Sequence, residues 1–242
     1  MAAAFDLLEV RIWRGTGYDG AWTTYQVPRR ENQTVLDVVT HVQRELEPTL
    51  AYRFACRVGM CGSCAMSVNE IPRWTCRTHV HNVIGENALT IAPLPNLPVV
   101  KDLCVDMEVF FEKWQRARGV YRSSRTRYQK FAHIPPAGPA RRQVDAGVEC
   151  INCAVCYAAC DVVARRPDYL GPAALNRAWT LISDERDDGD AERLRDVAGD
   201  AGCHACHSQQ SCRERCPIHL NPAGAIAALK RATTWAALRG RL

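Results

Sequence analysis

Apolar and polar residues alternate near the start of the chain. Residues 7–13, LLEVRIW, have the period of two that is typical of a strand, and residues 23–28, TTYQVP, are placed to form its hairpin partner. Residues 32–46, NQTVLDVVTHVQREL, carry apolar side chains at helical spacing. Short strand candidates follow at 65–72, AMSVNEIP, and at 88–94, ALTIAPL. We therefore predict a small mixed sheet that holds one helix.

Helical patterns dominate the rest of the chain. Residues 102–118 predict a helix that leaves the first domain. Residues 171–182 begin with Pro172 at a first-turn position. Residues 187–199 are acidic at their start and end at a glycine, which suits the helix dipole and a C-terminal stop. Residues 221–238 begin with Asn221, a preferred N-cap.

These elements predict an α+β protein with two domains. We place the first domain at residues 1–107 and the mostly helical domain at residues 146–242. Residues 108–145 would be the end of a helix and a basic linker.

Thirteen cysteines in 242 residues are the feature of the composition that needs an explanation. A secreted disulfide scaffold is one possibility, but such scaffolds are usually short and lack a large core. This chain is 47% hydrophobic, has an odd number of cysteines, shows no secretory leader and contains no run of about 18 apolar residues. We expect cysteines that bind metal in a reducing cytoplasm.

The first cysteine group has the spacing C-x4-C-x2-C followed by a distant fourth cysteine, which is the plant-type ferredoxin arrangement for a [2Fe–2S] cluster. Its members are Cys56, Cys61, Cys64 and Cys76. Gly59 and Gly62 would leave room for iron and sulfide and let backbone amides point at sulfur. A zinc knuckle is the alternative, because C-x2-C alone is weak evidence.

The second group, CINCAVCYAAC, has the bacterial ferredoxin spacing, in which the fourth cysteine binds the other of two clusters. The third group, CHSQQSCRERCP, follows the same template except that Gln209 replaces its middle cysteine. One site thus has four ligands and predicts [4Fe–4S], whereas the other has only three and predicts [3Fe–4S]. The predicted [4Fe–4S] ligands are Cys150, Cys153, Cys156 and Cys216, and the predicted [3Fe–4S] ligands are Cys160, Cys206 and Cys212.

Two cysteines, Cys104 and Cys203, are left over, and we expect them to be inert thiols. Cys203 is near enough in sequence to the third group to be a rival ligand. We expect the histidines at 79, 81, 204 and 219 to be structural or exposed.

Residues 113–142 contain nine lysines or arginines and no acidic residue. Nucleic-acid binding is one explanation, but no nucleic-acid motif accompanies the charge. We expect a solvated linker or a contact with an acidic partner; anionic lipid headgroups are another possibility.

The chain has no G-x-G-x-x-G, P-loop or catalytic-triad signature, so we predict no catalytic residue of its own. Tunnelling falls steeply with distance, and three clusters in series would carry electrons across the protein. We expect it to conduct electrons rather than to transform a substrate.

The order of the three cluster motifs resembles that of the iron–sulfur subunits of succinate dehydrogenase and fumarate reductase. The resemblance rests on FACRVGMCGSCAMSVN, CINCAVCYAAC, YLGPAALNRAW and the C-x5-C-x3-CP run, and it covers nearly the whole chain. It implies a β-grasp, plant-type ferredoxin-like domain followed by an all-α, bacterial-ferredoxin-like domain. It also implies a partner flavoprotein that carries FAD, membrane anchor subunits that can bear haem, and a quinone that accepts or donates electrons. The subunit would lie at the cytoplasmic face of the bacterial inner membrane, held there by the anchors.

The resemblance also implies a quinone pocket beside the [3Fe–4S] site. His207 and Lys230 match positions near that pocket in the family, whereas the residues after Cys160 depart from it. Asp161, Val162 and Arg165 stand where the succinate dehydrogenases with the best-known pocket have Pro, Ser and Trp. Quinone contacts near His207, Lys230 and Arg165 would then be rearranged or supplied by another subunit.

The sequence leaves three kinds of function open. Succinate oxidation and fumarate reduction share the same chemistry and differ in the potential of the quinone. A stand-alone electron carrier would be a stable monomer, and the iron–sulfur arm of another respiratory reductase would deliver electrons to a thiol or disulfide. Co-purification of a flavoprotein, together with reduction of the clusters by added succinate, would distinguish these alternatives.

Overall fold

A computed structural model describes residues 6–17, 19–85, 88–134, 136 and 138–242. Two compact units divide the chain. The first contains residues 1–107 and 151–159, and the second contains residues 108–150 and 160–242. The short segment 151–159 thus groups with the first unit, although the sequence pattern places it in the helical domain. The predicted domain limits themselves stay predictions.

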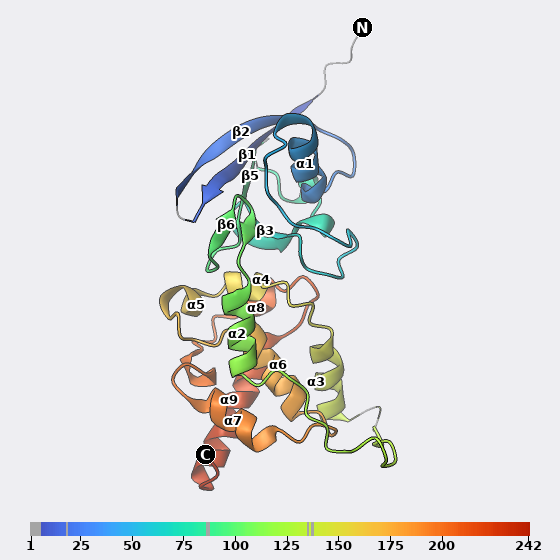
Figure 1. Ribbon diagram of the computed structural model, residues 1–242, viewed down its shortest axis with the longest axis vertical. Coiled ribbons are helices and arrows are strands. Elements are labelled where there is room, and N and C mark those ends of the chain that lie inside the picture. The colour runs from blue at the N-terminus through green and yellow to red at the C-terminus, as the bar shows by residue number, and fades with distance from the viewer. Residues whose placement is uncertain (1–5, 18, 86–87, 135, 137) are drawn as a thin grey trace. The chain divides into compact units, whose positions relative to one another are not determined.

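A mixed sheet forms the first unit. Among the described residues it has five strands in the order β2-β1-β5-β3-β4, and β1 pairs antiparallel with β2 and parallel with β5 (Figure 1). The strands are β1 (Leu7–Thr16), β2 (Asp19–Pro28), β3 (Ala65–Val68), β4 (Ile71–Trp74) and β5 (Ala88–Ala92). The predicted mixed sheet is confirmed.

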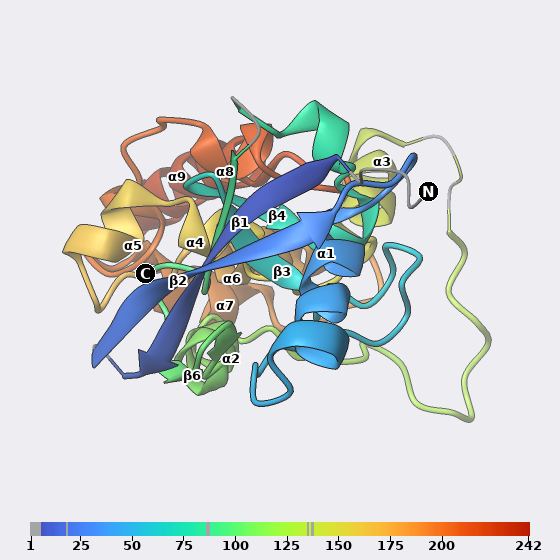
Figure 2. The ribbon, with the colours of Figure 1, turned by 90° about the horizontal axis from the view of Figure 1, so that it is seen from above.

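One helix packs against this sheet. Helix α1 (Val35–His41) continues into a π-helical turn (Val42–Leu46) and lies beside β1 in both views (Figure 1 and Figure 2). Leu8, Val10 and Ile12 alternate along β1 toward the helix and are fully buried with its valines. The Thr34 hydroxyl accepts from the Asp37 amide, while the Asp37 carboxylate accepts from the Thr34 amide. This capping box starts the helix where the pattern predicts.

Two predicted elements differ in the structure. The segment 65–72 is not one strand: β3 and β4 form a hairpin whose turn residues, Asn69 and Glu70, both have left-handed backbone conformations. The predicted helix 102–118 begins only at Glu108, because a second small sheet occupies the preceding residues. This sheet consists of β6 (Val99–Lys101) and β7 (Cys104–Val105).

Asp102 explains why the helix does not start earlier. Its side chain is buried in the turn between β6 and β7, and φ is 51°. One oxygen accepts from Arg14 Nε at 2.9 Å and from the Gly15 amide at 3.0 Å, and the other accepts from the Ala51 amide at 2.9 Å. These long-range hydrogen bonds hold the residue in a turn that a helical pattern in the sequence does not reveal.

The second unit is helical in its described residues. Helix α6 packs against α9, α3, α2 and α7 (Figure 1), and its buried face includes Leu175, Ala178 and Leu181. The helices are α2 (Glu108–Arg116), α3 (Pro139–Val148), α5 (Asp161–Arg165), α6 (Pro172–Ile182), α7 (Asp190–Ala198), α8 (Ser211–Glu214) and α9 (Pro222–Leu238). The remaining short helix, α4 (Val155–Ala158), belongs to the first unit.

The helices predicted at 171–182 and 221–238 are confirmed, and the helix predicted at 187–199 begins three residues later, at Asp190. Pro172 lies in the first turn of α6. The Asn221 side chain accepts a hydrogen bond from the Gly224 amide at 2.9 Å and caps α9. Helix α7 has acidic residues in its first turn and ends before Gly199.

The basic segment 113–142 is not solvated along its whole length. Lys113 and Arg141 are buried, whereas residues 121–131 are exposed. Arg118 forms ion pairs with Glu192, at 2.9 Å, and with Asp196, both on α7. Acidic residues of the same unit thus hold the start of this segment.

Candidate metal centres

The loop that carries Cys56, Cys61 and Cys64 directs backbone amides at sulfur. The amides of Val58, Met60 and Cys61 donate to Cys56 Sγ at 3.4, 3.3 and 3.3 Å. The Cys56 amide in turn donates to Cys61 Sγ at 3.5 Å. Amides that converge in this way stabilise negative charge on thiolate sulfur.

The fourth cysteine of this group is brought to the loop by backbone pairing. Both the amide and the hydroxyl of Thr75 donate to the carbonyl oxygen of Cys64, at 3.2 and 2.7 Å. Cys76 follows in a 3-10 turn (Thr75–Arg77) and lies with Cys64 and Leu36 in one buried cluster. The structure therefore unites all four predicted cysteines in the first unit.

Close packing explains the two glycines of the loop. Gly59 and Gly62 have φ of 76° and 71°. A Cβ on Gly59 would lie 2.9 Å from the Trp74 ring, and one on Gly62 would lie 2.6 Å from Cys153 Cβ. Other residues would be strained at both places, so the glycines permit the tight course of the loop.

The thiols of this loop lie in two different environments. Cys61 is exposed, and hydrogen bonds from the Ser63 hydroxyl and the Cys56 amide lower the pKa of Cys61 to about 6. Cys76 is buried, and burial together with the neighbouring Cys64 thiol raises the pKa of Cys76 to about 11. Iron would deprotonate Cys64 and Cys76, because coordination to a metal ion removes the thiol proton. Four thiols with converging amides fit a [2Fe–2S] cluster.

A second group of thiols converges in the helical unit. Cys160 caps α5, Cys206 follows a 3-10 turn (Cys203–Ala205), and Cys212 lies in α8. Burial raises the pKa of Cys212 to about 12, and the neighbouring Cys160 and Cys206 thiols contribute in the same direction. The Ser208 amide donates to Cys206 Sγ at 3.4 Å. One buried and two half-buried thiols, whose thiolate forms would repel one another, fit a site where iron supplies the positive charge.

The other four predicted ligands are divided between the units. Cys153 and Cys156 lie in the segment of the first unit that contains α4, where Asn152 and Ala154 adopt left-handed conformations. Cys150 and Cys216 belong to the second unit. Cys216 Sγ accepts from the Leu220 amide at 3.3 Å. The joint ligand set stays a prediction from cysteine spacing.

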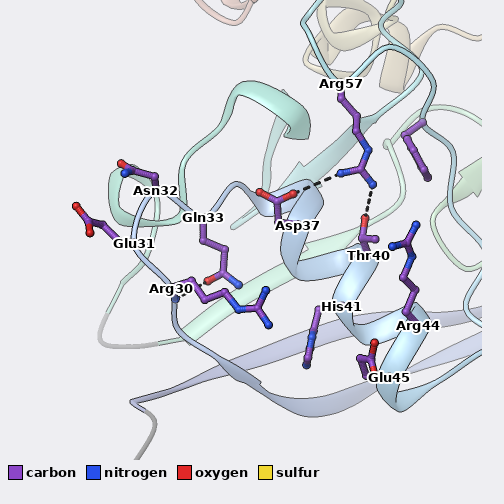
Figure 3. A pocket seen from close by; sticks show the side chains of 11 residues that line it. Arg30, Glu31, Asn32, Gln33, Asp37, Thr40, His41, Arg44, Glu45 and Arg57 are labelled. Carbon is purple, nitrogen blue, oxygen red and sulfur yellow. Dashed lines mark hydrogen bonds and ion pairs between the residues drawn. The ribbon is translucent and has the colours of Figure 1, made fainter.

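Among the described residues, no three His, Cys, Asp or Glu side chains are close enough to hold a single metal ion. A polar cavity of about 490 Å³ lies on the first unit next to the cysteine loop, lined in part by Arg30, His41 and Arg44. Arg57 lines one side of it and reaches α1, with Nη1 3.5 Å from Asp37 Oδ1 and Nη2 donating to Thr40 Oγ1 at 3.4 Å (Figure 3). No cysteine is among its described lining residues, so the cavity is distinct from the thiol sites.

Comparisons with known proteins match both cysteine regions. Residues 9–112 match a 2Fe-2S iron-sulfur cluster binding domain, and residues 148–220 match a 4Fe-4S dicluster domain. The fumarate reductase iron-sulfur subunit of Haemophilus influenzae is 35% identical over 217 residues, which cover 84% of this chain and 83% of that protein. The mitochondrial succinate dehydrogenase iron-sulfur subunit 1 of Oryza sativa is 36% identical over 198 residues, covering 81% of this chain and 70% of that protein.

This chain belongs to that family of iron–sulfur subunits. It binds a [2Fe–2S] cluster and clusters of the 4Fe–4S type. A chain of the Mycobacterium smegmatis Sdh1 complex in the apo form superimposes with a TM-score of 0.85 at 26% identity, covering 96% of this chain and 97% of that one. The predicted fold class is thereby confirmed.

Two of the positions that the family resemblance links to quinone lie beside Cys206. Lys230 Nζ donates to the Cys206 carbonyl oxygen at 2.6 Å, and His207 follows Cys206 directly and is exposed. Arg165 is exposed at the end of α5. A quinone role for these three residues stays a prediction.

The two cysteines outside the predicted ligand sets are at least partly buried. Cys203 is fully buried, with its sulfur 3.7 Å from Thr233 Oγ1 on α9. Burial raises the pKa of Cys104, which lies in β7.

None of the described helices is long and apolar enough to span a lipid bilayer.

Sequence reasoning missed three residues near the thiols. Ser63 contacts Cys61 Sγ at 3.1 Å. The Tyr169 hydroxyl is buried beside the three thiols of the helical unit. Lys113 is buried near Cys160, and burial followed by the charge of Arg116 lowers the pKa of Lys113. Two of the three lie in motifs that carry the family resemblance, Ser63 in FACRVGMCGSCAMSVN and Tyr169 in YLGPAALNRAW, whereas Lys113 lies in neither.

Proposed function

We propose that this chain is the electron-transfer subunit of a succinate dehydrogenase, a succinate:quinone oxidoreductase. Electrons would pass from the FAD of a flavoprotein subunit to quinone. Family membership supports the proposal, and so does the agreement between cysteine spacing and structure at two sites. The observation that carries it is the grouping of eleven cysteines into sets of four, four and three.

Each set would hold one cluster. Cys56, Cys61, Cys64 and Cys76 would bind [2Fe–2S]; Cys150, Cys153, Cys156 and Cys216 would bind [4Fe–4S]; and Cys160, Cys206 and Cys212 would bind [3Fe–4S]. When bound, such clusters take up and release single electrons without a bond being broken in the protein.

The chain itself positions and insulates these centres. Thiolates hold the iron, and amides such as those of Val58, Met60 and Ser208 stabilise negative charge on ligand sulfur. Burial of Cys64, Cys76 and Cys212 keeps water from part of the proposed [2Fe–2S] and [3Fe–4S] sites. Hydrogen bonding and burial are two of the factors that set reduction potentials.

The proposed partners follow from this role. They are a flavoprotein that carries FAD, membrane anchor subunits that can bear haem, and a quinone. We propose a peripheral location at the cytoplasmic face of the inner membrane and no role in nucleic-acid binding.

Quinol:fumarate reduction is the alternative direction. The names of relatives support it, because the Haemophilus influenzae subunit belongs to a fumarate reductase. The Oryza sativa subunit supports succinate oxidation instead. Electron transfer through the same three cysteine sets would serve either direction.

Low-temperature electron paramagnetic resonance of the native complex tests the proposal. We expect a [3Fe–4S] signal in the oxidised sample and a [2Fe–2S] signal after succinate is added. A flavoprotein should co-purify with the chain. Comparison of the rates of succinate oxidation and fumarate reduction, each with its quinone or quinol partner, would then establish which reaction is faster. A soluble chain with all its clusters but no flavoprotein would instead indicate a stand-alone carrier.

Replacing Gln209 with cysteine tests the three-ligand site. Gln209 is exposed between two residues with left-handed backbone conformations, where the ligand template has its middle cysteine. We expect Gln209→Cys to convert the three-iron site to four irons, so that the oxidised-state signal is lost from most molecules. Gln209→Ser is the matched control and should retain the signal. An undiminished signal in Gln209→Cys would show that this ligand assignment is misaligned.

A further inference from the structure

Tyr169 is a fully buried tyrosine whose hydroxyl has no hydrogen-bond partner among the described residues. Its exposed fraction is 0%, and its oxygen meets no donor or acceptor in hydrogen-bonding geometry. The backbone around it is firmly held, since the Tyr169 amide donates to the Arg166 carbonyl at 3.1 Å and the Leu170 amide donates to the Ala201 carbonyl at 2.8 Å. Buried hydroxyls are normally paired, so this one requires an explanation.

The surroundings of the hydroxyl indicate its partner. The three thiols of Cys206, Cys160 and Cys212 are its charged neighbours, and Cys206 is close enough to interact directly. These are the three cysteines that we assign to the [3Fe–4S] cluster. A neutral tyrosine hydroxyl has one O–H, which it can donate to thiolate or sulfide sulfur.

We propose that Tyr169 donates an O–H···S hydrogen bond to the Cys206 side of the [3Fe–4S] cluster and raises the reduction potential of that cluster. This inference rests on the proposed function, because it takes Cys160, Cys206 and Cys212 as the ligands. Reduction adds negative charge to the cluster, and a donor to sulfur stabilises that charge. Tyr169 is thus a positioning and tuning residue for the last cluster before quinone.

Tyr169→Phe removes the hydroxyl and keeps the ring. We expect the reduction equilibrium constant of the [3Fe–4S] cluster to fall about tenfold, which is about 59 mV for a one-electron couple. The midpoint potential is measured by redox titration of the oxidised-state paramagnetic signal in the intact complex. The other two clusters of the same sample provide an internal control and should keep their potentials.

Tyr121→Phe is the matched control in the same unit. Its hydroxyl donates to the Arg186 carbonyl at 2.9 Å on an exposed part of the surface. Loss of this hydroxyl should leave all three potentials unchanged. An equal shift in both variants would overturn the proposal, because the effect would then not depend on the position of Tyr169.

Pulsed paramagnetic resonance in heavy water distinguishes a hydrogen bond to the cluster from a purely structural role of Tyr169. The exchangeable hydroxyl should give a deuteron coupling to the three-iron signal in the parent protein, and Tyr169→Phe should lack it. A parent protein with no such coupling, or a variant that retains it with an unchanged potential, would overturn the hydrogen bond. If the parent protein shows no three-iron signal at all, the ligand assignment itself has failed.

Discussion

At the scale of single residues, the thiols of the [2Fe–2S] loop separate into two kinds. Hydrogen bonds from Ser63 and the Cys56 amide lower the pKa of Cys61 to about 6, so its exposed thiol is mostly ionised at pH 7. Burial raises the pKa of Cys76 to about 11. Iron binding must therefore release a proton from Cys76 but hardly any from Cys61, and cluster assembly should become easier as pH rises.

Ser63→Ala tests whether the hydroxyl beside the exposed Cys61 thiol affects the reduction potential of the [2Fe–2S] cluster. The variant removes the hydroxyl that lies 3.1 Å from Cys61 Sγ. Because hydrogen bonds to ligand sulfur favour the reduced state, we expect the [2Fe–2S] potential to fall by roughly 30–60 mV, equivalent to a three- to tenfold change in equilibrium constant. Redox titration measures this shift, and Ser124→Ala, an exposed serine of the other unit, is the control. An unchanged [2Fe–2S] potential would contradict this role for Ser63.

At the scale of elements, a buried ion pair at the start of α7 is hydrogen-bonded to the segment that follows α2. Arg193 Nη1 lies 2.7 Å from Asp187 Oδ1, and the two side chains are 1% and 0% exposed. Arg193 also donates through Nε to the Arg118 carbonyl at 3.0 Å, and the Arg122 amide donates to Asp187 at 2.9 Å. The packing of this part of the helical unit therefore depends on charged groups whose hydrogen bonds are satisfied.

Asp187→Asn should be strongly destabilising, because it leaves the Arg193 charge buried without its main partner. We expect a loss of about 3–5 kcal/mol in the free energy of unfolding at pH 7. Denaturant unfolding measures the loss. Asp188→Asn, at the exposed neighbouring residue, should cost less than about 0.5 kcal/mol. Similar losses in both variants would contradict the special role of the buried pair.

The pH dependence of this pair has a definite sign. Burial alone would raise the pKa of Asp187, but hydrogen bonds from Arg193 and from the Arg122 and Gly189 amides outweigh burial and lower it below its usual value of 3.8. A lowered pKa stabilises the folded state above the unfolded pKa, and this contribution is lost as pH falls through the folded value. The difference in stability between parent and Asp187→Asn should therefore shrink below about pH 4.

At the scale of the whole molecule, the proposed ligands come from loops and short helices, whereas each unit has a core of its own. The first core is formed by the sheet and α1, and the second by α6 and its neighbouring helices. Clusters would thus connect segments that lie far apart in the sequence, such as Cys160 and Cys212. Such cross-links stabilise the folded chain, because the unfolded chain has no preformed site.

Iron removal should consequently lower the stability of the protein. We expect about nine iron atoms in a fully loaded chain and a lower melting temperature after anaerobic chelation. Elemental analysis and thermal denaturation measure the two quantities. Incubation with the same chelator already saturated with iron is the control. Zinc in place of iron, or an unchanged melting temperature after complete iron loss, would contradict the assignment.

Local patterns in the sequence predict several features because their causes are local. Alternation along β1, the spacing of valines in α1, the first-turn residue Pro172 and the N-cap Asn221 each reflect interactions within one element. Cysteine spacing is equally informative, since a cluster requires ligands at short and regular separations. Spacing alone groups the four cysteines from Cys56 to Cys76 as one predicted ligand set.

Tertiary structure alone decides the features that depend on distant segments. Asp102 leaves its helical pattern because Arg14, Gly15 and Ala51 supply its hydrogen bonds. Tyr169 faces three thiols that lie from 9 to 43 positions away in the sequence. The sequence by itself therefore determined which cysteines are the candidate iron ligands and where most elements begin. Only the folded chain decided which polar groups are buried beside those cysteines, because burial and charge act through space.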